Sequence, residues 1–165
     1  MKTILLLDNR TGRQIEPRTS FTYTKKNNHL FFQFIAYDSS LNSYSNNDND
    51  ELYKGDVVEI FLDLGDDFYY EFEVAPAGAT FVAKIFNGKP QFINNNFFKS
   101  KTNIEANNYR VNIDIDLSSF KENSHIKFNA FRIETKGIRQ NYILQALSPT
   151  LTDSFHVRNK FVELI

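Results

Sequence analysis

The chain of 165 residues contains no cysteine, no tryptophan and a single methionine. The absence of cysteine excludes disulfide bonds, thiolate metal sites and a cysteine nucleophile. Six glycines are scattered at predicted turns, and they form neither a glycine-rich phosphate loop nor the GxSxG pattern of a serine nucleophile. Thiol redox chemistry is therefore excluded, and nucleotide binding has no support in the sequence.

Charge and the length of apolar runs argue against two further classes of partner. Nineteen Lys and Arg residues against twenty Asp and Glu residues leave no basic excess for binding nucleic acid. No apolar run approaches the roughly 20 residues of a membrane-spanning helix. The apolar run at residues 4–7 is shorter than the roughly 7–15 residues of a signal-peptide core. We therefore expect a soluble cytoplasmic protein, or an extracellular one if the chain is a fragment of a larger secreted protein.

Aromatic residues are abundant instead, with seventeen Phe and eight Tyr, and such residues favour strands. Apolar residues recur with period two, and turn residues such as Gly65 and the Asn87-Gly88 pair separate the runs. Residues 29–37 are apolar on both faces, which predicts a central strand. The pattern predicts a single all-β domain over residues 1–165, an antiparallel β-sandwich or jelly roll of immunoglobulin-like sandwich architecture. Its predicted strands are residues 29–37, 56–64, 69–75, 80–86, 109–117, 126–134 and 142–147.

Four carboxylates alternate with apolar residues on two neighbouring predicted strands: Glu59, Asp63, Glu71 and Glu73. A pair of such carboxylates is what a glycosidase uses. Carboxylates on an exposed strand face are more often solubilising or paired with cations across the sheet. The sequence gives no sign that one acid lies in an apolar pocket that would raise its pKa. We expect a solvated polar face.

Metal-ligand patterns are weak. The loop of residues 38–50 is rich in Asn, Ser and Asp, and Asp48, Asn49, Asp50 and Glu51 at its end have the oxygen ligands that Ca²⁺ prefers. The loop does not match the EF-hand pattern, so a structural Ca²⁺ there is a minor alternative to a solvated loop. Three separated histidines form no zinc motif. We expect His29 and His125 to be structural or exposed, and His156 to be a candidate hydrogen-bond donor to a ligand.

Four segments resemble consecutive segments of the family 9 carbohydrate-binding modules, and the resemblance runs from about Leu30 to the end of the chain. They are LYKGDVVEIFLDLG (52–65), YYEFEVAPAGATFVAKI (69–85), FNAFRIETKG (128–137) and LSPTLTDSFHVRNKFVEL (147–164). The resemblance implies a β-sandwich that clamps a sugar ring between two aromatic side chains. Carried over by position, the clamp falls on Tyr53 and Phe155, and the carboxylate that hydrogen-bonds sugar hydroxyls falls on Glu59.

The chain departs from the family pattern at its site. Both clamp positions are usually tryptophan, and Glu73 stands where characterised sugar binders often have arginine. Two neighbours add to the candidate site: Phe131 could line its floor, and Arg132 could neutralise the acidic face. Glu134 and Glu59 are equally plausible partners for Arg132, so its role stays open.

The sequence thus predicts a non-catalytic domain that binds a mono- or oligosaccharide and needs no cofactor. Its candidate ligand-binding residues are Tyr53, Glu59, Glu73, Phe131, Arg132, Phe155 and His156. A separately encoded glycoside hydrolase is a possible partner. One alternative is an interaction or structural module that has lost the sugar, and a less favoured one is a small glycoside hydrolase that uses Glu59 with Glu71 or Glu73.

Overall fold

The protein is described here by a computed structural model, which covers residues 2–38, 40–121, 125–135 and 142–164. Residues 39, 136 and 137, which belong to segments discussed above, lie outside these ranges. Among the described residues, strands alternate with short turns of 3-10 helix. These turns are η1 (Leu52–Lys54), η2 (Leu117–Ser119) and η4 (Arg158–Lys160). No helix in this part of the chain is long and apolar enough to cross a membrane.

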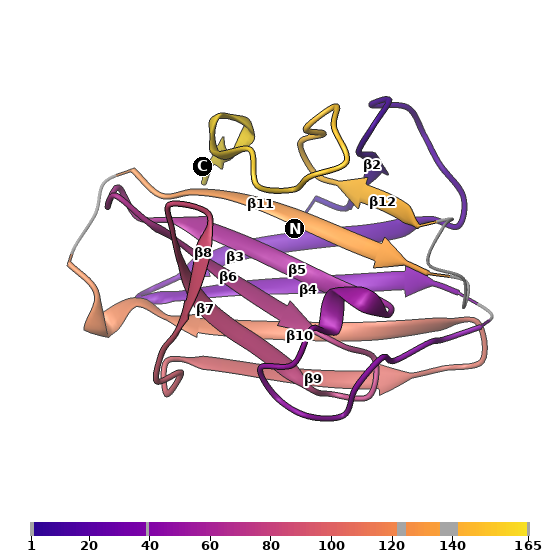
Figure 1. Cartoon of the computed structure of the whole chain (residues 1–165), viewed down its shortest axis with the longest axis horizontal. Helices are drawn as coiled ribbons and strands as arrows, with labels where there is room; N and C mark the ends of the chain where they lie inside the picture. The colour runs from indigo at the N-terminus through magenta and orange to yellow at the C-terminus, as the bar shows by residue number, and fades with distance from the viewer. Residues whose placement is uncertain (1, 39, 122–124, 136–141, 165) are drawn as a thin grey trace.

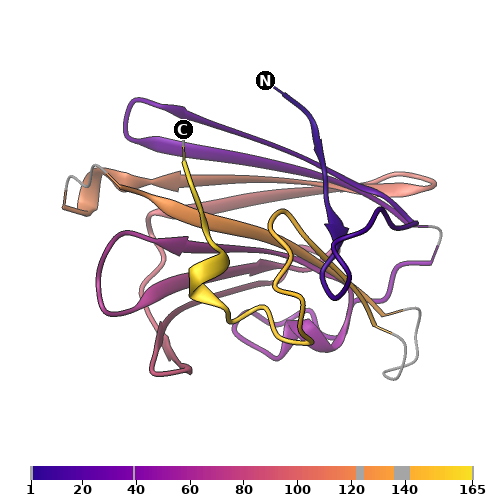
Figure 2. The ribbon, with the colours of Figure 1, turned by 90° about the horizontal axis from the view of Figure 1, so that it is seen from above.

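Two antiparallel sheets lie face to face, as Figures 1 and 2 show. The first sheet has the strand order β1-β3-β4-β10-β9. Its strands are β1 (Ile4–Leu5), β3 (Thr19–Lys26), β4 (His29–Tyr37), β10 (Asn108–Asp116) and β9 (Phe98–Ile104). The second sheet has the order β2-β12-β11-β5-β6-β7-β8, with β13 also paired to β11. Its strands are β2 (Leu7–Asp8), β12 (Ile143–Ala146), β11 (Lys127–Glu134), β5 (Val57–Asp63), β6 (Tyr69–Val74), β7 (Thr80–Phe86), β8 (Lys89–Phe92) and β13 (Val162–Glu163).

The predicted all-β antiparallel sandwich is confirmed. Each of the seven predicted strands is present, with both ends within one residue of the prediction. Strand β4 lies between β3 and β10, as its two apolar faces predicted. The short strands β1, β2, β8 and β13 were not predicted, and neither were the longer β3 and β9. Few apolar residues alternate in TSFTYTKK and FKSKTNI. Strand β9 lies at the edge of its sheet, where the charges of Lys99 and Lys101 oppose pairing with another chain.

The turns follow the residues that the sequence supplies. Asn87 and Gly88 both have positive φ, which allows the tight turn between β7 and β8 to match the twist of its strands. Gly65 also has positive φ in the β5–β6 hairpin, where its amide donates to the Oδ1 atom of Asp63. These turns place β5, β6, β7 and β8 side by side in one sheet.

The main core fills the space between the two sheets. Val58, Ile60 and Leu62 of β5 point into it, as their alternation predicted, and meet aromatic residues of the first sheet. Among these, Phe21 packs against Phe34 with ring centroids 4.9 Å apart. Burial of this apolar surface is the main force that holds the two sheets together.

A second apolar cluster covers the opposite face of the second sheet. It contains Phe61 and Phe131 from the strands together with Leu52 of η1 and Phe155 and Phe161 from the C-terminal segment. Figure 2 shows this segment and η1 on the side of the second sheet that faces away from the first. Strands β5 and β6 are therefore buried on both faces. The candidate site lies in this outer layer.

Candidate functional site

Three glutamates lie side by side on the outer face of the second sheet. Glu59 of β5 is paired across the strands with Glu73 of β6, and Glu71 lies two residues before Glu73 on the same face. Glu59 and Glu73 are each 2% exposed, and Glu71 is 6% exposed. One carboxylate oxygen from each lies within 4.8 Å of the other two. The expectation of a solvated polar face is therefore wrong, because η1 and the C-terminal segment cover it.

Burial raises the pKa of all three carboxyl groups. For Glu59 the pKa is raised well above its ordinary value by burial and by the charge of Glu71. For Glu73 burial again leads, followed by the charges of Glu59 and Glu71. Burial raises the pKa of Glu71 to about 7. The apolar surroundings that the sequence did not reveal are thus present, and they favour the protonated form of each group over its charged form.

Two aromatic side chains flank the glutamates. Tyr53 of η1 is 43% exposed, and its hydroxyl donates to the Oε1 atom of Glu51 over 2.9 Å. Its backbone N–H hydrogen-bonds the carboxylate of Glu73, which lowers the pKa of that group against the larger effect of burial. Phe155 lies in the C-terminal segment and stacks on Phe131, with ring centroids 4.2 Å apart and an interplanar angle of 15°. Phe155 is 7% exposed, so the remaining access to its ring is small.

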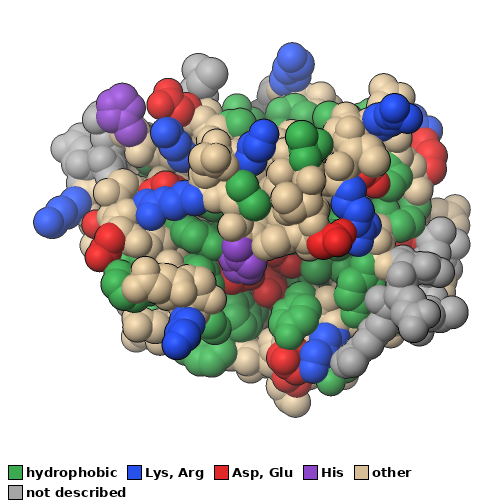
Figure 3. All heavy atoms as spheres, turned by 45° about the horizontal axis from the view of Figure 1, so that its top comes forward, with side chains coloured by type: hydrophobic (Ala, Val, Ile, Leu, Met, Phe, Trp, Pro, Cys, Tyr) green, Lys and Arg blue, Asp and Glu red, His purple; other side chains and the backbone are tan. Residues whose placement is uncertain are grey.

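These residues line two adjoining cavities. The first, of about 410 Å³, is lined by Tyr53, Phe155 and all three glutamates. The second, of about 420 Å³, extends over β7 and β8 to Phe92, and the two share Tyr53, Glu71, Glu73 and His156. Figure 3 shows a hollow in which acidic side chains lie deep between hydrophobic ones, with a histidine at its border. We call the two cavities together the acidic groove.

His156 borders the groove with a defined hydrogen bond. Its Nδ1 atom lies 2.5 Å from the hydroxyl of Tyr69. Burial raises the pKa of Tyr69 far above its ordinary value and lowers the pKa of His156. The tyrosine therefore donates to Nδ1 of a neutral imidazole, and the ring carries its own proton on Nε2. That N–H is a donor available to a ligand.

The structure brings five of the seven candidate residues to this groove: Tyr53, Glu59, Glu73, Phe155 and His156. Phe131 lies beneath Phe155 and is fully buried, so it supports the wall of the groove without reaching its surface. Glu71 completes the set of acids. Period-two alternation already placed it on the same face as Glu59 and Glu73, so the sequence did contain this signal.

Arg132 does not neutralise the acidic face. Alternation along β11 points it to the inner face, where one guanidinium nitrogen donates to the hydroxyl of Thr19 and to the carbonyl of Tyr37, both over 3.0 Å. The other terminal nitrogen is 3.1 Å from Asp38 and 3.9 Å from Glu134. Of Glu134 and Glu59, the two partners expected for Arg132, only Glu134 lies near it, and Asp38 is a further partner.

The other acidic and histidine candidates lie away from the groove. Asp63 forms two hydrogen bonds of 2.7 Å with the guanidinium of Arg158. His29 contacts Asp114 through its Nδ1 atom at 2.7 Å, and His125 is exposed.

In the loop of residues 38–50, the oxygen atoms that could bind Ca²⁺ accept hydrogen bonds from the protein instead. Asp48 accepts from the amide and hydroxyl of Thr80, and Asn49 accepts from the amide of Val82. Glu51 accepts from Tyr53 and pairs with Lys54. These bonds fasten the loop to β7 at the border of the groove.

Some groove residues were not singled out in the sequence. Arg10 and Tyr142 come from segments far apart along the chain, and Arg10 donates to the carbonyl of Tyr142 over 2.9 Å. Arg10 also pairs with Asp153, which brings the loop after β2 against the C-terminal segment. No local pattern marks such residues, because only the packing of loops brings them together.

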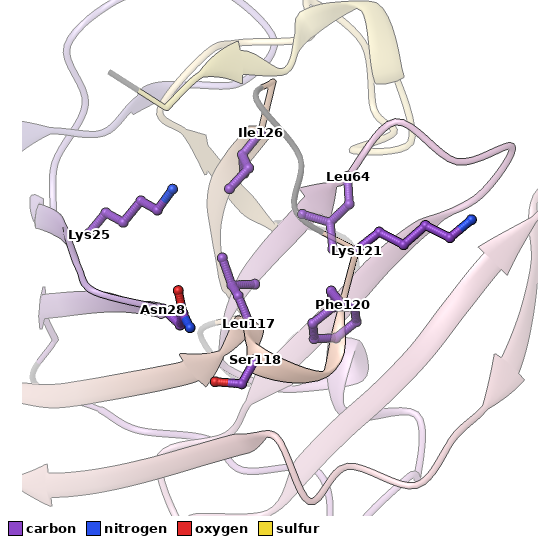
Figure 4. A pocket seen from close by; sticks show the side chains of 8 residues that line it. All are labelled: Lys25, Asn28, Leu64, Leu117, Ser118, Phe120, Lys121 and Ile126. Carbon is purple, nitrogen blue, oxygen red and sulfur yellow. The ribbon is translucent and has the colours of Figure 1, made fainter.

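A separate cavity of about 340 Å³ lies at one end of the sandwich, between the β3–β4 turn and η2 (Figure 4). Lys25 and Lys121 border it along with apolar side chains such as Leu117 and Phe120. The two ammonium groups lie far apart in Figure 4 and do not converge on one point. None of the candidate residues lines this cavity.

Comparison with known proteins identifies the family. The model of the carbohydrate family 9 binding domain-like family matches residues 5–160. The chain belongs to this family. No curated protein matches the chain by sequence.

Solved structures of family 9 modules share the fold. A family 9 carbohydrate-binding module from Caldicellulosiruptor kristjanssonii in complex with glucose has a TM-score of 0.71 and 20% identity, over 96% of this chain and 81% of its own. A family 9 module from the same organism in complex with cellotriose has a TM-score of 0.64 and 20% identity, over 87% and 71%. A Bacteroides uniformis protein inferred to bind carbohydrate has a TM-score of 0.83 and 18% identity, over 99% and 85%.

Proposed function

We propose that this family 9 domain binds a carbohydrate without catalysis, in the acidic groove between Tyr53 and Phe155. The observation that carries the proposal is the placement of an exposed tyrosine and a second aromatic ring in one cavity with buried carboxyl groups. The volume of that cavity, about 410 Å³, suits a small ligand. Membership of a carbohydrate-binding family, and neighbours in complex with glucose and cellotriose, support the same ligand class.

The chemistry of the groove suits a sugar. An aromatic face packs against the C–H face of a pyranose ring, and carboxylates accept strong hydrogen bonds from hydroxyl groups. Tyr53 has free ring surface for stacking, whereas Phe155 contributes only a small exposed area. Glu59 and Glu73 lie below them, and the Nε2–H group of His156 adds a donor. One ligand can therefore meet an apolar wall, acceptors and a donor together.

The same arrangement argues against glycoside hydrolysis. A glycosidase places its two carboxyl groups on either side of the scissile bond. Here the three carboxyl groups come from two adjacent strands and gather within 4.8 Å on one floor. The raised pKa values are what a general acid needs. Among the residues that line the first cavity, however, the only other carboxylate is Asp153, and it is paired with Arg10.

The proposal predicts that Tyr53→Ala weakens sugar binding. Loss of a stacking ring should reduce the affinity by roughly 1 kcal/mol or more, about fivefold. Isothermal titration with glucose and cellotriose measures the change. Tyr37→Ala is the matched control, because Tyr37 is similarly exposed, at 46%, but lies in the first sheet away from the groove.

Three outcomes would contradict the proposal. Equal affinities in Tyr53→Ala and Tyr37→Ala would show that the sugar binds elsewhere. An absence of binding to both sugars at millimolar concentration would favour an interaction module. Release of glucose from cellotriose during long incubation would show that the domain is a hydrolase.

A further inference from the structure

The three glutamates of the acidic groove lack the positive charge that such a cluster needs. Among the described residues, none of the ion pairs reaches Glu59, Glu71 or Glu73. Arg132, the cation nearest along β11, is held on the other face of the sheet by Asp38. Buried carboxylates are ordinarily paired with a cation or coordinate a metal.

One oxygen in the cluster is enclosed and without a partner. The Oε2 atom of Glu73 is inaccessible to solvent and accepts no hydrogen bond. Glu73 lines both cavities of the groove, and the N–H of Tyr53 holds its carboxylate in place. Glu71 and Glu73 share a side-chain hydrogen bond, yet the Oε2 atom of Glu73 still lacks a donor. A buried acceptor without a donor, in a residue that lines the cavity, points to a group that comes from solution.

The geometry of the cluster suits a single ion. No two of its three oxygens are farther apart than 4.8 Å, which is about twice the Ca²⁺–oxygen distance of roughly 2.3–2.6 Å. An ion at the centre of three oxygens at that limit lies slightly beyond the Ca²⁺–oxygen distance from each, so small side-chain rotations, without movement of β5 or β6, bring all three into its shell. The ligands are oxygens only, which suits Ca²⁺, and the strand pairing between Glu59 and Glu73 fixes their separation.

We propose that Glu59, Glu71 and Glu73 bind one Ca²⁺ ion at the floor of the acidic groove. The three carboxylates supply part of its coordination shell, and the open side of the cavity leaves the remaining positions to water. If the domain binds a sugar in the groove, hydroxyl groups can take those positions. That extension rests on the proposed function, whereas the ion site itself does not.

The test uses the whole chain, stripped of metal with a chelator, and no sugar. Ca²⁺ should bind with a stoichiometry of one in isothermal titration and should raise the melting temperature, because it binds the folded state. Tb³⁺ in place of Ca²⁺ should give luminescence excited through tyrosine, since Tyr53 and Tyr69 lie next to the glutamates. Glu73→Gln should weaken Ca²⁺ binding at least about tenfold.

Three further variants complete the test. Asp50→Asn changes an acidic residue at the border of the second cavity, outside the three glutamates, and should leave Ca²⁺ binding unchanged. Glu163→Gln, in β13 and away from the groove, is the matched control. Glu59→Gln serves as a second variant of the cluster in case Glu73→Gln fails to fold. The absence of Ca²⁺ binding by the unmutated chain at millimolar concentration overturns the proposal, and so does full binding by Glu59→Gln or Glu73→Gln. Loss of binding in Asp50→Asn alone would move the ion to the loop. Because no sugar is present, these outcomes are independent of carbohydrate binding.

Discussion

At the scale of single residues, burial decides the chemistry of the glutamates. Glu59, Glu71 and Glu73 occupy alternate strand positions that are usually solvated, yet each is almost fully enclosed. Enclosure raises their pKa values, because a charged carboxylate loses its hydration without gaining a protein cation. The same three side chains therefore hold their protons to a higher pH than exposed glutamates do.

The glutamates predict an unusual dependence of stability on pH for the metal-free protein. Their folded pKa values lie above the unfolded value of about 4.3, so the folded state binds more protons than the unfolded state between those values. The contribution of Glu71 is therefore complete below about pH 4.3 and is lost as the pH rises through about 7, its folded pKa. Glu59 and Glu73 act in the same direction. The free energy of unfolding should fall by roughly 1–3 kcal/mol between pH 5 and pH 8.

Urea unfolding at several pH values, with a chelator present, measures this change. Glu71→Gln should flatten the fall, because the amide does not ionise. Glu163→Gln, which alters an exposed glutamate of β13, should leave it unchanged. A fall of equal size in Glu71→Gln and in the unmutated chain would show that other groups cause it.

At the scale of elements, the groove depends on the C-terminal segment, and Asn9 holds that segment in place. The buried amide of Asn9 donates to the hydroxyl of Thr150 over 2.8 Å and to the carbonyl of Thr152 over 2.9 Å, and its oxygen accepts from the N–H of Thr150. Residues 150–156 form no strand and carry Phe155 and His156. Side-chain hydrogen bonds therefore hold this segment in place, as backbone hydrogen bonds between strands hold the sheets.

Asn9→Ala should loosen this segment. The change leaves the buried N–H of Thr150 without its partner, which costs about 1–3 kcal/mol. We expect faster hydrogen exchange at residues 150–156 and weaker sugar binding in a chain that keeps its sheets. Hydrogen exchange read by mass spectrometry checks the first, and titration with sugar checks the second.

Asn112→Ala is the control for this prediction, since Asn112 lies on the exposed face of β10, where it accepts from Gln33. It should change neither property. Unaltered exchange at residues 150–156 in Asn9→Ala would mean that the other contacts of the segment are sufficient to hold it.

At the scale of the whole molecule, one sheet supports two apolar clusters of different kinds. The inner cluster joins the two sheets and contains Phe72, which stacks on Phe98 with centroids 5.1 Å apart. The outer cluster joins the second sheet to η1 and the C-terminal segment. Phe161 belongs to it and meets Tyr69 edge to face at 5.3 Å. The fold thus separates the part that holds the sheets together from the part that shapes the groove.

This division predicts different results for two truncations. Phe72→Ala opens a cavity between the sheets and should lower the free energy of unfolding by about 3–5 kcal/mol. Phe161→Ala should lower it less, because the C-terminal segment can separate from the sheet without global unfolding. Chemical denaturation gives the first quantity, and hydrogen exchange of β11 and the C-terminal segment shows whether the loss is local. An equal loss of global stability in both variants would contradict this division.

The sequence by itself determined seven of the strands, the sandwich and the family. Period-two alternation is a local property, since side chains of a strand point to opposite faces, and it located β4, β5, β6 and β7 almost to the residue. Segments such as LYKGDVVEIFLDLG and SFHVRNKF indicated the family that the comparison shows. They also named four of the residues that line the groove, Tyr53, Glu59, Phe155 and His156.

Only the tertiary structure decided what those residues do. Whether Glu59 is solvated or buried depends on η1 and on a C-terminal segment about a hundred residues away, and no local pattern records that covering layer. Arg132 was expected near the acids, yet its position in β11 and its ion pair with Asp38 place it on the opposite face of the sheet. The shape of the groove and the raised pKa values of its glutamates are therefore properties of packing, which brings distant residues together and removes their water.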